Sequence, residues 1–379
     1  MTSAYIHIPF CEQICYYCDF NKVFIEGQPV DDYVNLLIEE FRLWNERETI
    51  LPLKSIYIGG GTPTALSVKQ FEVLFDGIRN YLPLRRGGEF TIECNPNNAT
   101  NDLLTCFKRN NVNRLSFGVQ SFNDDLLKKI GRIHRCDTVY KAINLAEQIG
   151  FHNISIDLIY RLPNQTLEDF QDSLTKALEL DLPHYAIYSL ILEQKTVFYN
   201  LMRQGKLPLP SEDIEADMFE MAIESMENAG KQHYEISNFA QAGFQSTHNK
   251  AYWNGEDYYG FGAGAHGLLD GTRYQNLGPI NHYMEPLQKH ELPIFNTLPL
   301  SQKMKIEEFF FLGLRQMEGV SISLFEKKFG QSIGELYGDE ISQLLEKDLI
   351  TLDGDHLALT RRGIFLGNDV FSEFMLLDR

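Results

Sequence analysis

Three cysteines, Cys11, Cys15 and Cys18, lie within eight residues of one another near the N-terminus. Thiolates at this C-x3-C-x2-C spacing can converge on one soft metal centre, because a short loop lets the sulfurs point inward together. A closed zinc site and a four-thiolate cluster each need four protein ligands, so three cysteines favour a [4Fe–4S] cluster with one iron left open for chemistry. Zinc held by the three cysteines with His7 as fourth ligand, or unrelated buried thiols, are the alternatives at this point.

The elements around the cysteines predict how the loop is held. Residues 3–8 are rich in β-branched and aromatic side chains and predict a strand that Pro9 ends, which puts the cysteines at its carboxyl end. A second strand, at 55–58, runs directly into the glycine-rich stretch 59–64. Ser67, three residues before a glutamine, then predicts a capping box that opens the next helix. The order is strand, glycine loop, helix.

The same alternation continues along the chain. Further strands are predicted at 89–93, 114–120, 153–160 and 184–192, with helical periodicity between them and an extra strand at 232–237. The predicted caps and stops of the helices are Asp31 or Asp32, Asn123, Asp137, Thr166, Ser211, Gly150 and Gly230. Counted from residue 3, six β/α repeats predict a parallel sheet with right-handed crossovers. Repetition alone does not separate a barrel from an open sheet, but polar and glycine residues recur at strand ends, where barrels place their sites.

From about residue 300 the pattern changes to helices without parallel strands between them. Helices are predicted at 303–315, 321–330 and 333–347, followed by a hairpin at 350–359 with a turn at Asp353-Gly354. We therefore expect three parts: a barrel at 1–240, a bridging segment at 241–299 and a helical, winged-helix-like domain at 300–379. The few basic residues near the hairpin do not form the footprint of a DNA-binding domain, so we predict a lid or docking domain and no nucleic-acid partner.

Composition excludes several classes of protein. The chain has 379 residues and a formal net charge of −18, which argues against general nucleic-acid binding and against polybasic attachment to anionic lipid. The first residues lack the pattern of a signal peptide, and no apolar run approaches the ~18 residues of a spanning helix, so we expect a cytoplasmic protein. Cys94, Cys106 and Cys136 are scattered, and we predict small core residues rather than a disulfide framework.

The glycine stretch Gly59-Gly-Gly-Thr62 permits close backbone approach to a ligand, because glycine has no Cβ. In combination with the cysteine loop it resembles the radical S-adenosylmethionine (SAM) superfamily, and the six repeats resemble that superfamily's partial (βα)6, TIM-like barrel. The resemblance implies that Cys11, Cys15 and Cys18 ligate a [4Fe–4S] cluster whose open iron chelates the amino and carboxylate groups of SAM. It also implies reductive cleavage of SAM to methionine and a 5′-deoxyadenosyl radical.

Further motifs extend the resemblance over almost the whole chain, to the oxygen-independent coproporphyrinogen III oxidase family and its relatives. These motifs lie at 5–11, 59–64, 93–96, 116–121, 131–134 and 157–163. The positions that contact SAM in this family match Tyr5, Tyr17, Gly60, Gly61, Thr62 and Glu93. Positions on the nucleoside side, which in the oxidases help to hold a second SAM, match Gln120, Arg132 and Asp157. The alternative is that these polar groups only cap barrel loops or form surface pairs.

The chain departs from the oxidases at three places. Phe20 stands where the oxidases usually carry a further cysteine, the extended segment before the oxidase barrel is missing, and Arg161 stands where glycine is common. These departures match instead the haem chaperone subgroup, which carries a His-Asn-x-x-Tyr-Trp motif, present here as His248-Asn-Lys-Ala-Tyr252-Trp253. Imidazole is a suitable axial ligand for haem iron, and aromatic rings can pack on a porphyrin. His266 and His134 are competing candidates for the ligand, and an ordinary loop histidine is the alternative.

The resemblance implies a function in which haem is cargo. It implies haem binding and delivery to acceptor haemoproteins, including acceptors in the respiratory membrane, so that the cytoplasmic protein would also work at the membrane periphery. The cluster and SAM would serve or regulate the transfer, and haem binding would be accompanied by formation of a homodimer. Two alternatives stay open: a coproporphyrinogen III oxidase that makes protoporphyrinogen IX, and a zinc-stabilised barrel without redox chemistry.

Overall fold

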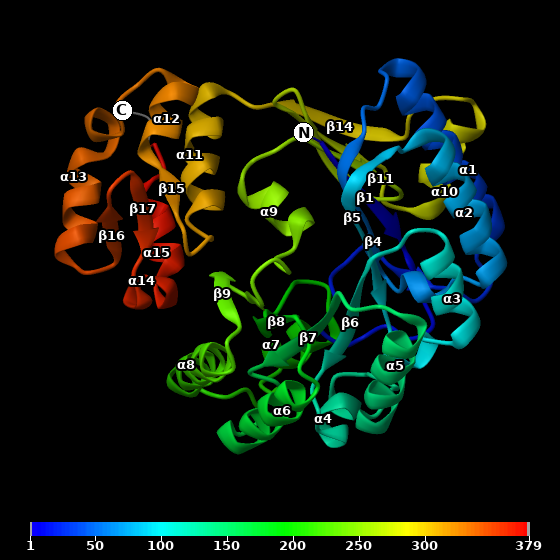
Figure 1. Ribbon diagram of the computed structural model, residues 1–379, viewed down its shortest axis with the longest axis horizontal. Helices are drawn as coiled ribbons and strands as arrows, with labels where there is room; N and C mark the ends of the chain where they lie inside the picture. Colours follow the sequence, from blue (N-terminus) through cyan, green and yellow to red (C-terminus); the bar gives the residue numbers. More distant parts are fainter. Residues whose placement is uncertain (1, 377–379) are drawn as a thin grey trace.

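The computed structural model describes residues 2–376 and has one large curved sheet with helices outside it (Figure 1). Six parallel strands form the centre of the sheet in chain order: β1 (Ser3–Ile8), β4 (Leu53–Gly60), β5 (Leu84–Cys94), β6 (Arg114–Gln120), β7 (Ile154–Tyr160) and β8 (His184–Ser189). Within residues 2–376 the sheet contains twelve strands and does not close on itself. The predicted partial barrel with six β/α repeats is therefore confirmed.

Six of the eight helices of the repeats begin at a residue whose side chain caps them, and the first and the fifth do not. They are α1 (Val30–Arg47), α2 (Val68–Tyr81), α3 (Asn101–Arg109), α4 (Asp124–Lys129), α5 (Cys136–Ile149), α6 (Leu167–Glu179), α7 (Val197–Arg203) and α8 (Glu212–Asn228), with single 3-10 turns at η1 (Pro63–Ala65) and η2 (Pro96–Asn98). The capping box at Ser67 is confirmed, and Asn123, Thr166 and Ser211 cap their helices as predicted. Gly150 ends α5 in the left-handed region.

Two predicted caps are wrong. The first helix begins at Val30 after Pro29, so Asp31 and Asp32 lie in its first turn, where carboxylates stabilise the positive end of the helix dipole. Helix α5 begins after Arg135, which likewise puts Asp137 inside the first turn.

The extra strand predicted at 232–237 is a hairpin rather than one strand. It consists of β9 (Gln232–Glu235) and β10 (Asn238–Ala240), and β10 pairs antiparallel with β8 at one end of the sheet.

Residues 241–299 extend the other end of the same sheet. This segment contains α9 (Thr247–Trp253), β11 (Tyr258–Phe261), β12 (His266–Leu269), β13 (Thr272–Asn276), α10 (Ile280–Gln288) and β14 (Ile294–Pro299). Strand β11 lies parallel beside β1, and β12, β13 and β14 follow antiparallel. The segment that we predicted as a bridge thus contributes four strands to the barrel sheet, although the three-part division itself stays a prediction.

A buried carboxylate on α1 fixes this segment. Glu40 is fully buried and accepts hydrogen bonds from the Gly262 backbone N–H at 2.8 Å, the Asn276 amide at 2.6 Å and the Tyr283 hydroxyl at 2.6 Å. Burial raises the pKa of Glu40 to about 7. Three donors from distant parts of the chain compensate the desolvation of one carboxylate, so Glu40 links α1 to both β13 and α10.

The C-terminal part has a hydrophobic core of its own, centred on buried aromatic side chains that include Phe310, Phe325 and Tyr337. Its elements are α11 (Gln302–Gly313), β15 (Val320–Ser321), α12 (Ile322–Phe329), α13 (Ile333–Glu346), β16 (Ile350–Asp353), β17 (His356–Leu359), α14 (Arg361–Phe365) and α15 (Gly367–Glu373). Three helices followed by the β16–β17 hairpin, with β15 as third strand, give the winged-helix-like arrangement predicted. Residues 1 and 377–379 lie outside the described residues.

None of the helices within residues 2–376 is both long enough and apolar enough to cross a lipid bilayer.

Candidate functional site

A cavity of about 250 Å³ lies at the carboxyl ends of the six parallel strands. Eleven of the site residues predicted from the sequence line this cavity, namely Cys11, Cys15, Tyr17, Cys18, Gly60, Gly61, Thr62, Glu93, Gln120, Arg132 and Asp157. Tyr5 does not line the cavity, but its hydroxyl lies 2.9 Å from His7 Nδ1 on the same strand. The strands place these side chains together because all the carboxyl ends of a parallel sheet meet at one edge.

Backbone pairing ties the cysteine loop to the glycine stretch. Residues Phe10–Cys11 form the short strand β2, which pairs with β3 (Val23–Phe24). The backbone N–H groups of Gly61 and Thr62 donate to the carbonyls of Ile8 and Phe10. A Cβ at Gly61 would lie 2.9 Å from both Cys11 Sγ and the Phe10 carbonyl oxygen, which no real side chain tolerates. Glycine is thus required here by the close approach of the two loops.

The three thiols have the surroundings of metal ligands rather than of free core cysteines. Thr62 Oγ1 donates to Cys11 Sγ at 3.5 Å, and Arg132 Nη1 donates to Cys15 Sγ at 3.6 Å. Burial raises the pKa of Cys11, and it raises the pKa of Cys18 to about 11. Thiolates in this place therefore need a bound cation to be stable, and three sulfurs that face one cavity fit a cluster with an open iron.

In the zinc alternative His7 would be the fourth ligand, but its ring nitrogens already have other partners. His7 Nε2 is bonded to the Asn21 carbonyl at 2.7 Å, and Nδ1 is bonded to the Tyr5 hydroxyl, so neither ring nitrogen is free. Among residues 2–376, no three His, Cys, Asp or Glu side chains are spaced to hold a single metal ion. Zinc needs its ligands about 2.3 Å or less from one point, whereas a four-iron cube spreads its thiolates over separate iron atoms.

Two half-buried carboxylates contribute the negative charge of the cavity lining. Glu93 accepts from the Tyr57 hydroxyl at 2.9 Å and from the Gly60 N–H at 3.1 Å. Burial, with the nearby charge of Asp157, raises the pKa of Glu93 to about 7. Asp157 accepts from Ser116 Oγ at 3.2 Å, and burial raises its pKa to about 6. A cationic ligand would relieve both desolvated carboxylates.

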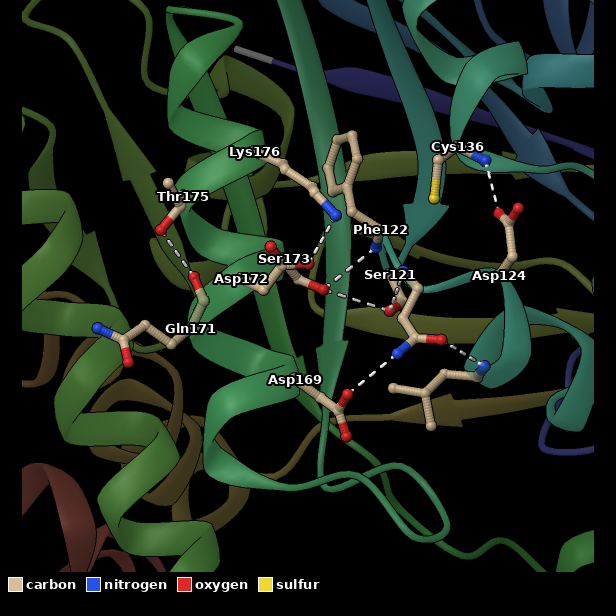
Figure 2. Close-up of polar contacts among 12 residues, drawn as sticks. Ser121, Phe122, Asp124, Cys136, Asp169, Gln171, Asp172, Ser173, Thr175 and Lys176 are labelled. Atoms are coloured by element: carbon tan, nitrogen blue, oxygen red, sulfur yellow. Dashed lines mark hydrogen bonds and ion pairs between the residues drawn. The ribbon is translucent and has the colours of Figure 1, made fainter.

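The end of β6 is held in an unusual backbone conformation. Gln120 has φ = 68°, in the left-handed region that non-glycine residues rarely adopt, and it faces the cavity. Figure 2 shows how the following loop is fixed: Ser173 Oγ accepts from the Phe122 N–H at 3.2 Å and contacts Ser121 Oγ at 3.4 Å. The Asn123 amide donates to Asp169 at 3.0 Å. Helix α6 therefore anchors the loop that presents Gln120.

Arg132 reaches back across this strand end. Its Nη2 donates to the Gly118 carbonyl and, at 3.5 Å, to Asn95 Oδ1. A Cβ at Gly118 would lie 2.9 Å from the guanidinium, so glycine makes room for it. Arg161, one of the departures from the oxidases, has φ = 63° and pairs with Glu215 at 2.9 Å. The left-handed backbone explains why glycine suits that position.

Several lining residues were missed by the sequence reasoning. Asn95, Ser116, Ser155, Tyr188 and Asn238 also face the cavity. A signal was present for two of them, because Ser116 alternates with Gly118 and Gln120 on β6, and Ser155 precedes Asp157 by two residues on β7. Residues two apart on a strand share one face. Tyr188 and Asn238 had no comparable signal.

The histidine motif lies on α9, where His248 and Tyr252 face the barrel and Trp253 faces the C-terminal part. His248 is 2% exposed, with Nδ1 2.9 Å from Ser55 Oγ and Nε2 2.9 Å from the Tyr252 hydroxyl. Its ring stacks on Tyr57, and burial lowers the pKa of His248 to about 3. Trp253 instead faces the C-terminal part and lies under the Arg315 guanidinium, 4.6 Å from the ring centroid. The structure does not bring His248, Tyr252 and Trp253 to one open surface.

The competing histidines also lie outside the cavity lining. His134 is 2% exposed, its Nε2 is 3.0 Å from the Val119 carbonyl, and burial lowers its pKa to about 4. His266 is exposed at the start of β12. The assignment of a haem ligand stays a prediction.

Comparison with known proteins agrees with these features. Residues 5–177 match the radical SAM superfamily, and residues 300–366 match the HemN C-terminal domain. The chain is 49% identical to heme chaperone HemW of Bacillus subtilis over 99% of both chains, and 49% identical to HemW of Lactococcus lactis over 100% of this chain and 98% of that one. The solved structure of Escherichia coli coproporphyrinogen III oxidase (HemN) has a TM-score of 0.86 at 24% identity, covering 99% of this chain and 90% of that one.

The oxidase structure shows that the fold is shared from the barrel to the C-terminal part, and at 24% identity it carries no more than the fold. The family assignment rests on the sequence relatives. The two HemW proteins named above are identical to this chain at nearly half of the aligned positions, over almost its entire length. This chain belongs to the heme chaperone HemW family, within the radical SAM superfamily.

Proposed function

We propose that the protein is a haem chaperone that binds haem and delivers it to acceptor haemoproteins. The full-length 49% identity to two proteins named heme chaperone HemW carries this proposal. One departure from the oxidases supports it as well: Phe20, in place of the further cysteine, lines the cavity and is 59% exposed, so this position offers no thiol.

We propose further that Cys11, Cys15 and Cys18 hold a [4Fe–4S] cluster and that the adjoining cavity holds SAM. When bound, the cluster supplies an electron and an open iron site to SAM. Glu93 and Asp157 offer hydrogen-bond acceptors and the negative charge that a sulfonium compound favours. Gly60 and Gly61 allow the ligand to approach the backbone.

Arg132 and Gln120 would add hydrogen-bond donors to the same SAM cavity, since both line it. Tyr17 from the cysteine loop and Thr62 from the glycine stretch would limit access of water. Tyr5 would act through His7 and the strand rather than by direct contact.

The acceptors, the oligomeric state and the location belong to the same proposal. We expect acceptor haemoproteins of the respiratory membrane, a cytoplasmic protein that meets them at the membrane periphery, and a homodimer when haem is bound. Size-exclusion chromatography with and without haemin measures the last point, and an unchanged monomer would contradict it.

The experiment that tests the function is anaerobic. The cluster is reconstituted and confirmed spectroscopically, and the protein then receives SAM, a reductant and coproporphyrinogen III, with a parallel haemin titration and transfer to an apo-haemoprotein. We expect stoichiometric haemin uptake, transfer to the acceptor and no porphyrin product. Formation of protoporphyrinogen would instead establish the oxidase, whose fold the chain shares. Absence of haemin uptake would overturn the chaperone function.

A further inference from the structure

A second cleft, of about 330 Å³, lies between α9 and the C-terminal part, well apart in sequence from the cysteine loop. Figure 1 shows α9 between the sheet and helices α11 and α12. The walls of the cleft are apolar, with Trp253 from α9, Leu268 from β12, and Phe309, Leu312 and Leu324 from α11 and α12. Volumes from about 300 Å³ upward are typical of ligand sites with this kind of lining.

Two lysines without a charge partner stand at the rim of this cleft. Lys305 on α11 and Lys328 on α12 both line it, and within residues 2–376 neither ammonium makes an ion pair or a hydrogen bond. The stem of Lys328 packs near the rings of Phe309 and Phe329, with its ammonium 5.8 Å and 5.6 Å from their centroids. This partial desolvation lowers the pKa of Lys328, and the positive charge of Lys305 lowers it further.

The acidic residues of the cleft do not cancel this charge. Asp257 and Glu308 both act on Lys328, and Glu308 is also paired with Arg273 at 3.1 Å, so three cations stand against two carboxylates around the cleft. Lys305 and Lys328 therefore bring local positive charge to one cleft in a chain whose formal net charge is −18. The cleft thus combines an apolar floor with a positive rim.

The position of Trp253 connects this cleft to the histidine motif. His248 and Tyr252 are bonded to each other and face the barrel, whereas Trp253 is the residue of the motif that lines the cleft. A large aromatic wall beside apolar side chains suits a flat ring, and a positive rim suits carboxylates at one end of the same molecule.

We propose that this cleft between α9, α11 and α12 takes the cargo, a planar apolar tetrapyrrole, and that Lys305 and Lys328 bind its two propionates. The inference rests on the proposed haem chaperone function and names the site that the function requires. The carboxylates remain at the solvent edge, where the lysines lie, and the apolar ring fills the space beside Trp253.

The test compares haemin with its dimethyl ester, which keeps the ring and loses both carboxylates. Lys305→Gln, Lys328→Gln and the matched control Lys327→Gln are titrated with each compound in the full chain. Lys327 is exposed on the same helix and does not line the cleft, so its replacement changes the net charge alone. We expect haemin affinity to fall about tenfold for each of the first two variants and to stay within about twofold for the control.

The ester separates charge recognition from damage to the fold. Its affinity should be the same in the wild type and all three variants, because the lysines would have nothing to bind. Leu324, which is 52% exposed, gives a second test: Leu324→Glu should weaken haemin binding and Leu324→Lys should not. If the wild type binds haemin but Lys305→Gln and Lys328→Gln behave like the control, the cleft is not the site. If the wild type takes up no haemin, the proposed function itself fails.

Discussion

The cavity at the barrel mouth and the cleft beside the C-terminal part are similar in size, about 250 Å³ and 330 Å³, but they are built differently. The cavity collects residues from the ends of successive strands and contains charges of both signs, with Glu93, Asp157 and Arg132 around one space. The cleft joins two separately cored parts of the chain and has an apolar floor with two lysines at its rim.

This difference indicates two ligands of opposite character. A cavity with desolvated carboxylates favours a ligand that brings positive charge, as a sulfonium compound with an amino group does. A cleft with a hydrophobic floor and ammonium groups at its edge favours an amphipathic anion. The comparison therefore predicts that cofactor and cargo bind independently and that each responds to different substitutions.

The largest expected effect is loss of the cluster. Cys11→Ala, Cys15→Ala or Cys18→Ala should each reduce iron and acid-labile sulfide to background and abolish SAM binding, because three ligands already leave one iron open. Cys106→Ala, a buried cysteine on α3, is the control and should keep both. Haemin uptake should survive in all four variants. A parallel loss of haemin uptake would show that the two sites are one.

The next effect is on stability. The pKa of Glu93 is about 7 in the folded chain, above its ordinary 4.5, so the folded state keeps a proton that the unfolded state releases between these values. The free energy of unfolding should fall as pH rises from 4.5 to 7, by about 3 kcal/mol at most for this group. Glu93→Gln should reduce that slope in urea denaturation without SAM, while Glu40 and Asp157, whose pKa values are also raised, keep their share of it. A slope that is unchanged by the substitution would contradict the pKa.

SAM affinity should change in the opposite direction with pH. Because ionised Glu93 attracts a cationic ligand, binding should strengthen about tenfold between pH 6 and pH 8, as the carboxylate with a pKa of about 7 loses its proton. Calorimetric titration of wild type and Glu93→Gln measures this, and the variant should keep only the smaller change, about twofold, that Asp157 causes with its pKa of about 6. Haemin binding at the cleft should not follow this profile, and a shared pH dependence would break the distinction between the two sites.

The smallest expected effect concerns His248. Both of its ring nitrogens are bonded and the ring is 2% exposed, so His248→Ala should lower stability, by about 1–3 kcal/mol for the lost buried contacts, and change haemin affinity less than twofold. Thermal denaturation and haemin titration distinguish these outcomes. A loss of haemin affinity much larger than twofold, with a changed haem spectrum, would establish the axial role predicted from the motif.

Much of the cavity could be predicted from the sequence because its determinants are local. The strand at 114–120 was predicted with its observed bounds, and the capping box at Ser67 needs only three residues of context. Cys11, Cys15, Cys18 and the glycine stretch lie immediately after strands, so knowing the strands and their parallel order is enough to place them at one edge. The predicted caps Asp31 and Asp137 were wrong because a carboxylate stabilises a helix both at the N-cap and within the first turn.

The sequence determined the β/α repeats, the cysteine loop and the set of polar residues that gather at the barrel mouth. Tertiary structure alone decided that β11 lies beside β1, more than 250 residues earlier, that Glu40 binds the segment carrying β13 and α10, and that His248 and Trp253 face different surroundings. Strand periodicity and helix caps depend on residues close together in the sequence, so they can be recognised locally. The contacts just named join residues far apart in the sequence and depend on which surfaces pack together. The cleft with Lys305 and Lys328 exists because two cores, each folded from its own residues, meet beside α9.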